Sequence, residues 1–202
     1  MKRAPPPSAG APSAGGSRAS AVADAVQALF RERGATSYYG ERVTLAEHML
    51  QTAHAAETEG APVALVLAAL LHDIGHLVEA VPEDLADWSF DAHHEEVGAR
   101  WLAERFGPEI VEPVRLHVPA KRYLCATDHA YLATISEASL FTLKLQGGPM
   151  SPEEMRRFEG AAHHRDAVRV RRWDDAGKRA GTVTPDLEHY RALIDAHARA
   201  RD

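Results

Sequence analysis

An apolar run over residues 63–71 leads directly into His72, Asp73 and His76, and this feature most constrains what the chain can fold into. With 3.6 residues per helical turn, His72 and His76 share one helix face, while Asp73 points about 100° away from His72. Imidazole groups bind iron, zinc and other first-row metals, and a neighbouring carboxylate can bridge two ions. The run therefore predicts a buried helix over residues 63–77 that carries a metal site. An isolated His-Asp pair is also compatible with a turn cap and core histidines.

Length and composition favour one soluble domain. The chain has 202 residues, of which 45% are hydrophobic, so it can bury a substantial core. Its formal net charge of -6 argues against nucleic acid or an anionic membrane as its main partner. No stretch approaches the roughly 20 apolar residues of a membrane-spanning helix. Cys125 is the single cysteine, which excludes an intramolecular disulfide and indicates a packing role in a reducing cytoplasm.

The pattern along the chain predicts an all-α protein. Residues 1–18 are rich in Pro, Ala, Gly and Ser and are expected to be a disordered tail, with one domain over residues 19–202. Helix starts are expected near residues 20, 44, 63, 91, 108, 131, 151, 161 and 184. Residues 161–179 also show some strand-like alternation, although a helix fits better. No convincing sheet emerges, so we expect one all-α domain of roughly seven to nine helices.

Caps and breakers set several helix boundaries. Capping boxes of the form Ser/Thr-x-x-Glu begin at Thr44 and Ser151, and Asp91 is expected to cap the helix after the central one. Thr184 is expected to cap the last helix. Pro119 is expected to end the helix that starts at residue 108, so that Lys121 enters from a loop or a new helix start.

Six histidines and aspartates fall on five predicted helices, and convergence of separate helices is how helical folds build di-metal carboxylate sites. These candidate ligands are His48, His72, Asp73, His94, His117 and Asp174. Seven further histidines are expected on solvated faces or caps: His54, His93, His129, His163, His164, His189 and His197. Asp175 is a lower-ranked alternative to Asp174, and Lys178 either orders the ligand helix or is solvated.

The order of the six candidate ligands resembles the metal pattern of the HD-domain superfamily in its binuclear form, over about residues 36–180. The resemblance implies a single HD-domain helical bundle with a buried di-metal site. It assigns His48, His72 and Asp174 to one ion and His94 and His117 to the other, with Asp73 as the bridge. Most HD proteins are metal-dependent phosphohydrolases, in which the cation lowers the pKa of a bound water.

Five further segments resemble the phosphonate-cleaving branch of the mixed-valent di-iron HD oxygenases, which are related to myo-inositol oxygenase. They are residues 38–41 (YYGE), 117–125 (HVPAKRYLC), 136–142 (SEASLFT), 145–150 (LQGGPM) and 172–178 (RWDDAGK). The resemblance implies an Fe(II)/Fe(III) pair that uses O2 to cleave a small 1-hydroxyphosphonate, such as 2-amino-1-hydroxyethylphosphonate or an N-methylated form, to a carboxylic acid and phosphate. An upstream hydroxylase would supply that substrate. A phosphohydrolase and a degenerate HD binding module are the alternatives, and the filled ligand positions argue against the second.

The resemblance also implies substrate contacts. His76, Lys121, Ser139 and Thr142 are expected at the phosphonate, because a dianion needs charge and hydrogen-bond donors. Tyr38 and Glu41 are expected at the entrance, where the tyrosine would fill a vacant iron position before substrate arrives and the carboxylate would contact an amino group.

Overall fold

The computed structural model describes residues 14–38, 40–79 and 93–199 of the chain. Across these ranges there are twelve α-helices and no β-strand, and Ser37 and Thr44 form an isolated β-bridge. The helices are α1 (Ala14–Arg33), α2 (Leu45–Thr58), α3 (Val63–Leu71), α4 (Ile74–Val78), α5 (His94–Ala103), α6 (Pro108–Arg115), α7 (His117–Thr127), α8 (His129–Leu132), α9 (Glu137–Leu145), α10 (Pro152–Glu159), α11 (His164–Ala176) and α12 (Leu187–His197). The predicted all-α fold is confirmed, although the helices are more numerous than expected.

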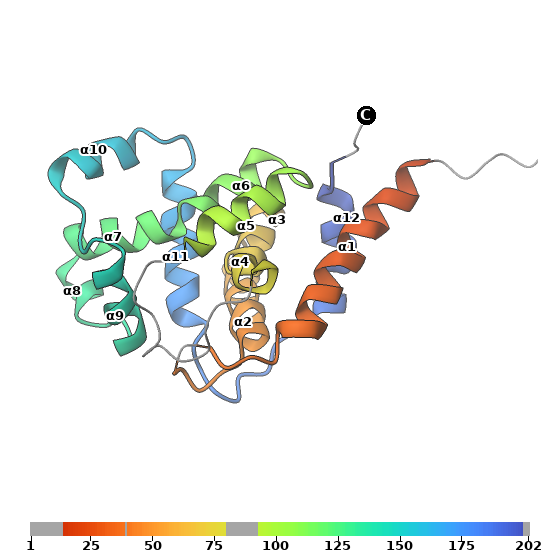
Figure 1. Ribbon diagram of the computed structural model, residues 1–202, viewed down its shortest axis with the longest axis horizontal. Helices are drawn as coiled ribbons and strands as arrows, with labels where there is room; N and C mark the ends of the chain where they lie inside the picture. Colours follow the sequence, from red (N-terminus) through yellow and green to blue (C-terminus); the bar gives the residue numbers. More distant parts are fainter. Residues whose placement is uncertain (1–13, 39, 80–92, 200–202) are drawn as a thin grey trace, which may run out of the picture.

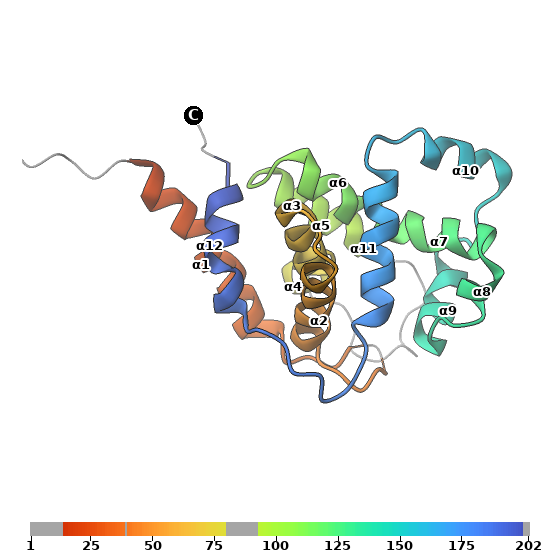
Figure 2. The ribbon, with the colours of Figure 1, turned by 180° about the vertical axis from the view of Figure 1, so that it is seen from behind.

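The helices fall into three groups (Figure 1, Figure 2). Helices α2–α6 and α11 occupy the centre, α1 and α12 pack together on one side, and α7–α10 lie on the other side. The largest hydrophobic cluster joins the first two groups. Two smaller clusters lie beneath α7–α11, and Cys125 packs in one of them as expected. We call α7–α10 the peripheral helices.

Local chemistry sets the ends of α1 and α2. The Thr44 side chain accepts from the Glu47 amide at 3.2 Å, and the Glu47 carboxylate accepts from the Thr44 amide at 2.7 Å, so the predicted capping box is present. Gly34 follows α1 at a close approach, because a Cβ there would lie 2.8 Å from the Cβ of Ala46. These two features fix the position of α2 against the end of α1.

The central run is two helices, where the sequence predicts one. Helix α3 ends at Leu71 and α4 begins at Ile74, with Asp73 in a non-helical conformation (φ -101°, ψ 14°). The apolar pattern hides this break because the residues on both sides of it are buried. Helix α4 then packs closely on α5, since a Cβ at Gly75 would lie 2.0 Å from the carbonyl oxygen of His94. The turn and the close packing together bring α5 beside Asp73.

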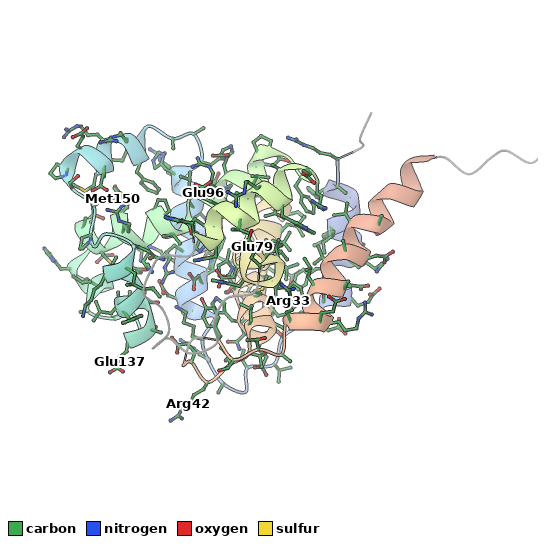
Figure 3. The ribbon with its side chains drawn as sticks, in the orientation of Figure 1. Arg33, Arg42, Glu79, Glu96, Glu137 and Met150 are labelled. Atoms are coloured by element: carbon green, nitrogen blue, oxygen red, sulfur yellow. The ribbon has the colours of Figure 1, made fainter. Side chains whose placement is uncertain are left out.

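The C-terminal end of α4 is held by α1. The Arg33 guanidinium donates to the carbonyl oxygens of Leu77 and Val78, each at 3.0 Å. Figure 3 shows Arg33 beside Glu79 at the end of α4. Arginine here satisfies carbonyl groups that a helix end leaves without intrahelical donors.

The prediction that Pro119 ends a helix is wrong. Helix α6 already ends at Arg115, and α7 begins at His117 with Pro119 in its first turn. Proline is tolerated there because the first turn of a helix makes no intrahelical bond from its amide groups. Lys121 is therefore held on a helix, one turn after His117.

Other boundaries also differ from expectation. The apolar pattern from residue 131 to 146 predicts one helix, but the structure has two, α8 and α9, because the Ser136 side chain caps α9. Asp186, rather than Thr184, caps α12. Helix α1 begins at Ala14, inside the segment expected to be a tail, and Asp91 lies outside the described residues. Among the described residues no helix is long and apolar enough to cross a membrane.

Candidate metal centre

Four buried side chains from α2, the α3–α4 turn and α11 form a first cluster. His48 Nε2 lies 3.1 Å from His72 Nε2 and 3.4 Å from Asp174 Oδ1. Asp73 Oδ2 lies 3.3 Å from His72 Nε2 and 3.5 Å from His48 Nε2. All four side chains are buried, so their ligand atoms converge away from solvent.

A second cluster forms around the other oxygen of Asp73. His94 Nε2 and His117 Nε2 lie 3.1 Å apart, and Asp73 Oδ1 lies 3.3 Å and 3.5 Å from them. His76 lies further away, with its Nε2 4.0 Å from Asp73 Oδ1. Two groups that could hold a metal ion, His48 with His72 and Asp73, and Asp73 with His94 and His117, thus share one carboxylate. The structure brings all six candidate ligands together.

Backbone carbonyls fix the protonation of three of these imidazole rings. The pairs are His48 Nδ1 with Gly177 O (3.0 Å), His72 Nδ1 with Ala69 O (2.8 Å) and His117 Nδ1 with Val114 O (2.7 Å). A carbonyl can only accept, so each Nδ1 carries the proton and each Nε2 of the neutral ring presents a lone pair. The 3.1 Å between His48 Nε2 and His72 Nε2 therefore suits a cation that both rings bind.

Charge and hydrogen bonding also fit bound cations. Asp73 Oδ2 and Asp174 Oδ1 are buried and have no hydrogen-bond partner among the described residues. Burial alone would raise the pKa of Asp73, but His72 and His94 hold it well below its usual range. Burial likewise opposes the positive charge of His72 and His94, yet Asp73 raises the pKa of both rings. The centre attracts positive charge, and its nitrogen and oxygen donors suit iron and other first-row metals.

His94 differs from the other rings because its second nitrogen faces a carboxylate. Its Nδ1 lies 3.7 Å from Glu95 Oε2, and both atoms are buried without a hydrogen-bond partner among the described residues. Metal-bound histidines commonly donate their other N–H to a carboxylate, which orients the ring and makes it a stronger ligand. Glu95 is not among the residues that the sequence predicts for the site, and its position directly after a candidate ligand was the available indication.

A pocket of about 460 Å³, counting its open mouth, adjoins both clusters. The six sequence-predicted substrate contacts all line it: Tyr38, Glu41, His76, Lys121, Ser139 and Thr142. Asp73, His94, His117 and Asp174 reach the same pocket. A ligand in it would contact the candidate metal ligands directly.

Lys121 and Thr142 form one unit in this pocket. Lys121 is only 2% exposed, and its ammonium donates to Thr142 Oγ1 at 2.8 Å. The Thr142 hydroxyl in turn donates to the Ser139 carbonyl at 3.2 Å. Burial, with Arg171 nearby, lowers the pKa of Lys121 to about 7. Thr142 therefore orients Lys121, and the proton of the Thr142 hydroxyl is already donated to the Ser139 carbonyl.

The entrance residues lie close to the first cluster. The Tyr38 ring stacks on the His48 ring, with centroids 4.0 Å apart and planes 14° from parallel. Glu41 and Gln146 each have a buried side-chain oxygen, Oε1, without a hydrogen-bond partner among the described residues. Glu41 and Gln146 therefore offer acceptors to the pocket, and Lys121 offers it a cation.

Arg171 organises the wall between these two sides. It is buried and donates to Asp174 Oδ2, to both oxygens of Asp175, and to the Tyr131 hydroxyl at 2.9 Å. Tyr131 also donates to Asp175 at 2.6 Å. Asp175, ranked as an alternative ligand, is thus held in this network and is in neither metal group found among the described residues. Lys178 lies against Asp174 and is not solvated.

Comparison with known proteins identifies the family. The model for the HD domain matches residues 45–196, which include all six candidate ligands. The chain belongs to the HD-domain family. Two curated relatives of this HD protein refine the assignment. This chain is 45% identical over 169 residues to hydroxymethylphosphonate dioxygenase of Gimesia maris. The aligned region covers 83% of this chain and 84% of the relative.

The second relative is named 1-hydroxy-2-(trimethylamino)ethyl phosphonate dioxygenase (glycine-betaine-forming), from Leisingera caerulea. It is 44% identical over 183 residues, covering 89% of this chain and 93% of the relative. The predicted resemblance to the phosphonate-cleaving HD oxygenases is thus confirmed, and the protein is an enzyme of this dioxygenase group.

The remaining histidines of the chain lie outside the candidate metal centre. Seven of the 12 histidines lie outside the centre, and none of these seven is buried. All seven were predicted on solvated faces or caps. Arg171 was not predicted, although an arginine three residues before Asp174 shares its helix face and was in principle recognisable.

Proposed function

We propose that this HD-domain dioxygenase uses two iron ions and O2 to cleave a small 1-hydroxyphosphonate to a carboxylic acid and inorganic phosphate. The carbon–phosphorus bond breaks, and carbon and phosphorus each gain one oxygen atom from O2. The hydroxylated carbon is oxidised to a carboxylate, O2 is reduced, and one proton is released. No further reductant is needed for this balance.

One observation carries the proposal: two clusters of buried histidine Nε2 atoms share Asp73 beside a pocket that has a buried lysine. His48, His72 and Asp174 would hold one iron, His94 and His117 would hold the other, and Asp73 would bridge them. The pair, as Fe(II)/Fe(III), would supply the redox chemistry with O2. Three or four protein ligands per ion leave positions for other groups, unlike a closed structural site.

The phosphonate end would be bound by Lys121, Ser139 and His76. The Lys121 ammonium lies in a pocket that Arg171 and Lys178 also line, and these two other cations are paired with Asp174 and Asp175. Burial lowers the pKa of His76 well below its usual range, and the ring stacks on His94 at 4.0 Å. A neutral His76 ring donates one hydrogen bond and adds no repulsion to the metals. Thr142 would act by holding the Lys121 ammonium in place.

The other end of the substrate would lie at Tyr38, Glu41 and Gln146. The unpartnered oxygens of Glu41 and Gln146 need hydrogen-bond donors, and a primary or partly methylated ammonium supplies them. We therefore favour 2-amino-1-hydroxyethylphosphonate or its N-methylated forms. Tyr38, stacked on His48, would cover the first iron before substrate enters. The substrate's hydroxyl implies a preceding enzyme that hydroxylates an unactivated phosphonate.

The test is reconstitution with Fe(II) without oxygen, followed by aerobic incubation with a panel of phosphonates. The panel is hydroxymethylphosphonate, 2-amino-1-hydroxyethylphosphonate and its N-trimethylated form. We expect phosphate release and O2 uptake in equal amounts, and an electron paramagnetic resonance signal of a mixed-valent pair after partial oxidation. Hydrolysis of phosphate esters with magnesium or manganese, with no O2 uptake by the iron form, would establish the alternative phosphohydrolase instead.

A further inference from the structure

The hydroxyl group of Ser139 is surrounded by donors. Ser139 lies on α9, is 6% exposed and lines the pocket. Its Oγ lies 3.2 Å from Arg171 Nη2 and 3.0 Å from Lys178 Nζ, both of which come from the α11 side of the pocket. Guanidinium and ammonium groups can only donate hydrogen bonds. Ser139 therefore accepts from both.

These two bonds decide where the Ser139 proton points. A hydroxyl has two acceptor lone pairs and one proton, and here both lone pairs are occupied. No acceptor for this proton occurs among the described residues, whereas Thr142, one turn later, donates to the carbonyl of Ser139. The Ser139 proton is left to point into the pocket, where it can bind an anion.

Arg171 and Lys178 are themselves held in place. Arg171 is bound by Asp174, Asp175 and Tyr131, and Lys178 lies 3.3 Å from Asp175 Oδ1 and 3.4 Å from Asp174 Oδ1. Two cations thus face two carboxylates, one of which is a candidate metal ligand. Neither cation is free to turn away from Ser139 without giving up a buried ion pair.

We propose that Arg171 and Lys178 are positioning residues that make Ser139 an obligate hydrogen-bond donor to a tetrahedral oxyanion in the pocket. The identity of the natural oxyanion, a phosphonate, rests on the proposed function. The donor geometry does not, because it follows from the hydrogen bonds alone. The same carboxylate, Asp174, then serves both the metal centre and the anion-binding wall.

The experiment is a double-mutant cycle on sulfate binding. Sulfate keeps its dianionic charge over the working pH range, and it is titrated calorimetrically into the iron-loaded protein under nitrogen. Ser139→Ala should weaken sulfate binding roughly 10- to 150-fold, the range for a hydrogen bond to a charged group. Lys178→Met should weaken it comparably. The double variant should bind no more than about threefold worse than Ser139→Ala, because Lys178 acts largely through Ser139.

Three controls separate positioning from general effects. Lys178→Arg keeps a donor and should restore most of the binding, which a loss of packing would not allow. Lys144→Met removes an exposed positive charge from the same helix as Ser139 and should leave sulfate binding within about twofold. The iron content of each variant shows whether it has lost the metal centre. If Lys178→Met has lost its iron, Arg171→Lys replaces it in the cycle.

Additive losses in the cycle, or unchanged sulfate binding by Ser139→Ala, would overturn the proposal. Because sulfate binding needs no turnover, a protein that binds sulfate as described but cleaves no phosphonate would leave this inference standing and remove the proposed function. Normal phosphonate cleavage together with additive losses in the sulfate cycle would leave the proposed function standing and overturn this inference.

Discussion

Replacing Lys121 by methionine should abolish most of the affinity for a dianion and also its dependence on pH. Lys121 is buried, its ammonium contacts Thr142 at 2.8 Å, and burial lowers its pKa to about 7. Methionine has a similar length and no charge, so it preserves packing and removes the cation. The structure therefore predicts both the size of the loss and the pH range over which it occurs.

The size follows from the protonation of Lys121. At pH 6 roughly nine-tenths of the ammonium is protonated in the free protein, given a pKa of about 7. A charge-assisted contact contributes about 1.5–3 kcal/mol, so the variant should bind sulfate roughly 10- to 150-fold more weakly at pH 6. Above pH 7 the wild type must take up a proton to bind, and it should lose up to about tenfold in affinity per pH unit. The protonated form binds, so affinity is present below pH 7 and is lost as the pH rises.

The assay is calorimetric titration of sulfate into iron-loaded protein at pH 6, 7 and 8, in two buffers with different ionisation enthalpies. The difference between buffers reports proton uptake, which should approach one proton per sulfate for the wild type at pH 8 and be smaller for Lys121→Met. Titrating groups on the metals affect both proteins and cancel in this comparison. Equal pH dependence in the two proteins would refute the assignment of Lys121 to the anion.

Four other substitutions test the rest of the site. Asp73→Asn should lose iron from both clusters, because a neutral amide compensates the charge of two cations poorly. His76→Ala should keep both ions in elemental analysis. An iron-free His76 variant would contradict the assignment of His76 as a substrate contact and not a metal ligand. Glu41→Gln should reduce kcat/KM for aminated phosphonates far more than for hydroxymethylphosphonate, and equal losses would remove the amine contact. Glu95→Gln should weaken iron binding at the second cluster roughly 10- to 100-fold. Glu96→Gln, at a neighbouring side chain that is 45% exposed, is its control, and equal iron affinity in the two variants would exclude a role for Glu95.

Local rules that can be read in the sequence help to position the candidate ligands. The capping box at Thr44 fixes the start of α2, so the face on which His48 lies is set before any tertiary contact forms. The break at His72 and Asp73 was not predictable from periodicity, because buried residues continue through it. The break nevertheless matters, because it directs the two oxygens of Asp73 towards different pairs of histidines.

The sequence was insufficient for the hydrogen-bond network around the pocket. Arg171 and Ser139 are 32 residues apart, and neither position has a pattern that specifies the other. An arginine in a helix rich in charged residues is usually solvated, so a buried one is found only when the packing of α11 against the peripheral helices is known. Glu95 was missed for a similar reason, since its burial depends on contacts that the sequence does not specify.

The buried network around Arg171 is better explained by geometry than by stability. Burying Arg171 with Asp174 and Asp175 costs desolvation that apolar side chains of similar size would avoid, so the ion pairs are weak evidence of a gain in folding free energy. Apolar replacements could fill the same space between α11 and the peripheral helices, which are otherwise joined by small hydrophobic clusters. They could not occupy the lone pairs of Ser139 or orient the oxygens of Asp174. The network sets the orientation of an anion donor and a candidate metal ligand together, which is what a substrate that contacts both the wall and the metals requires.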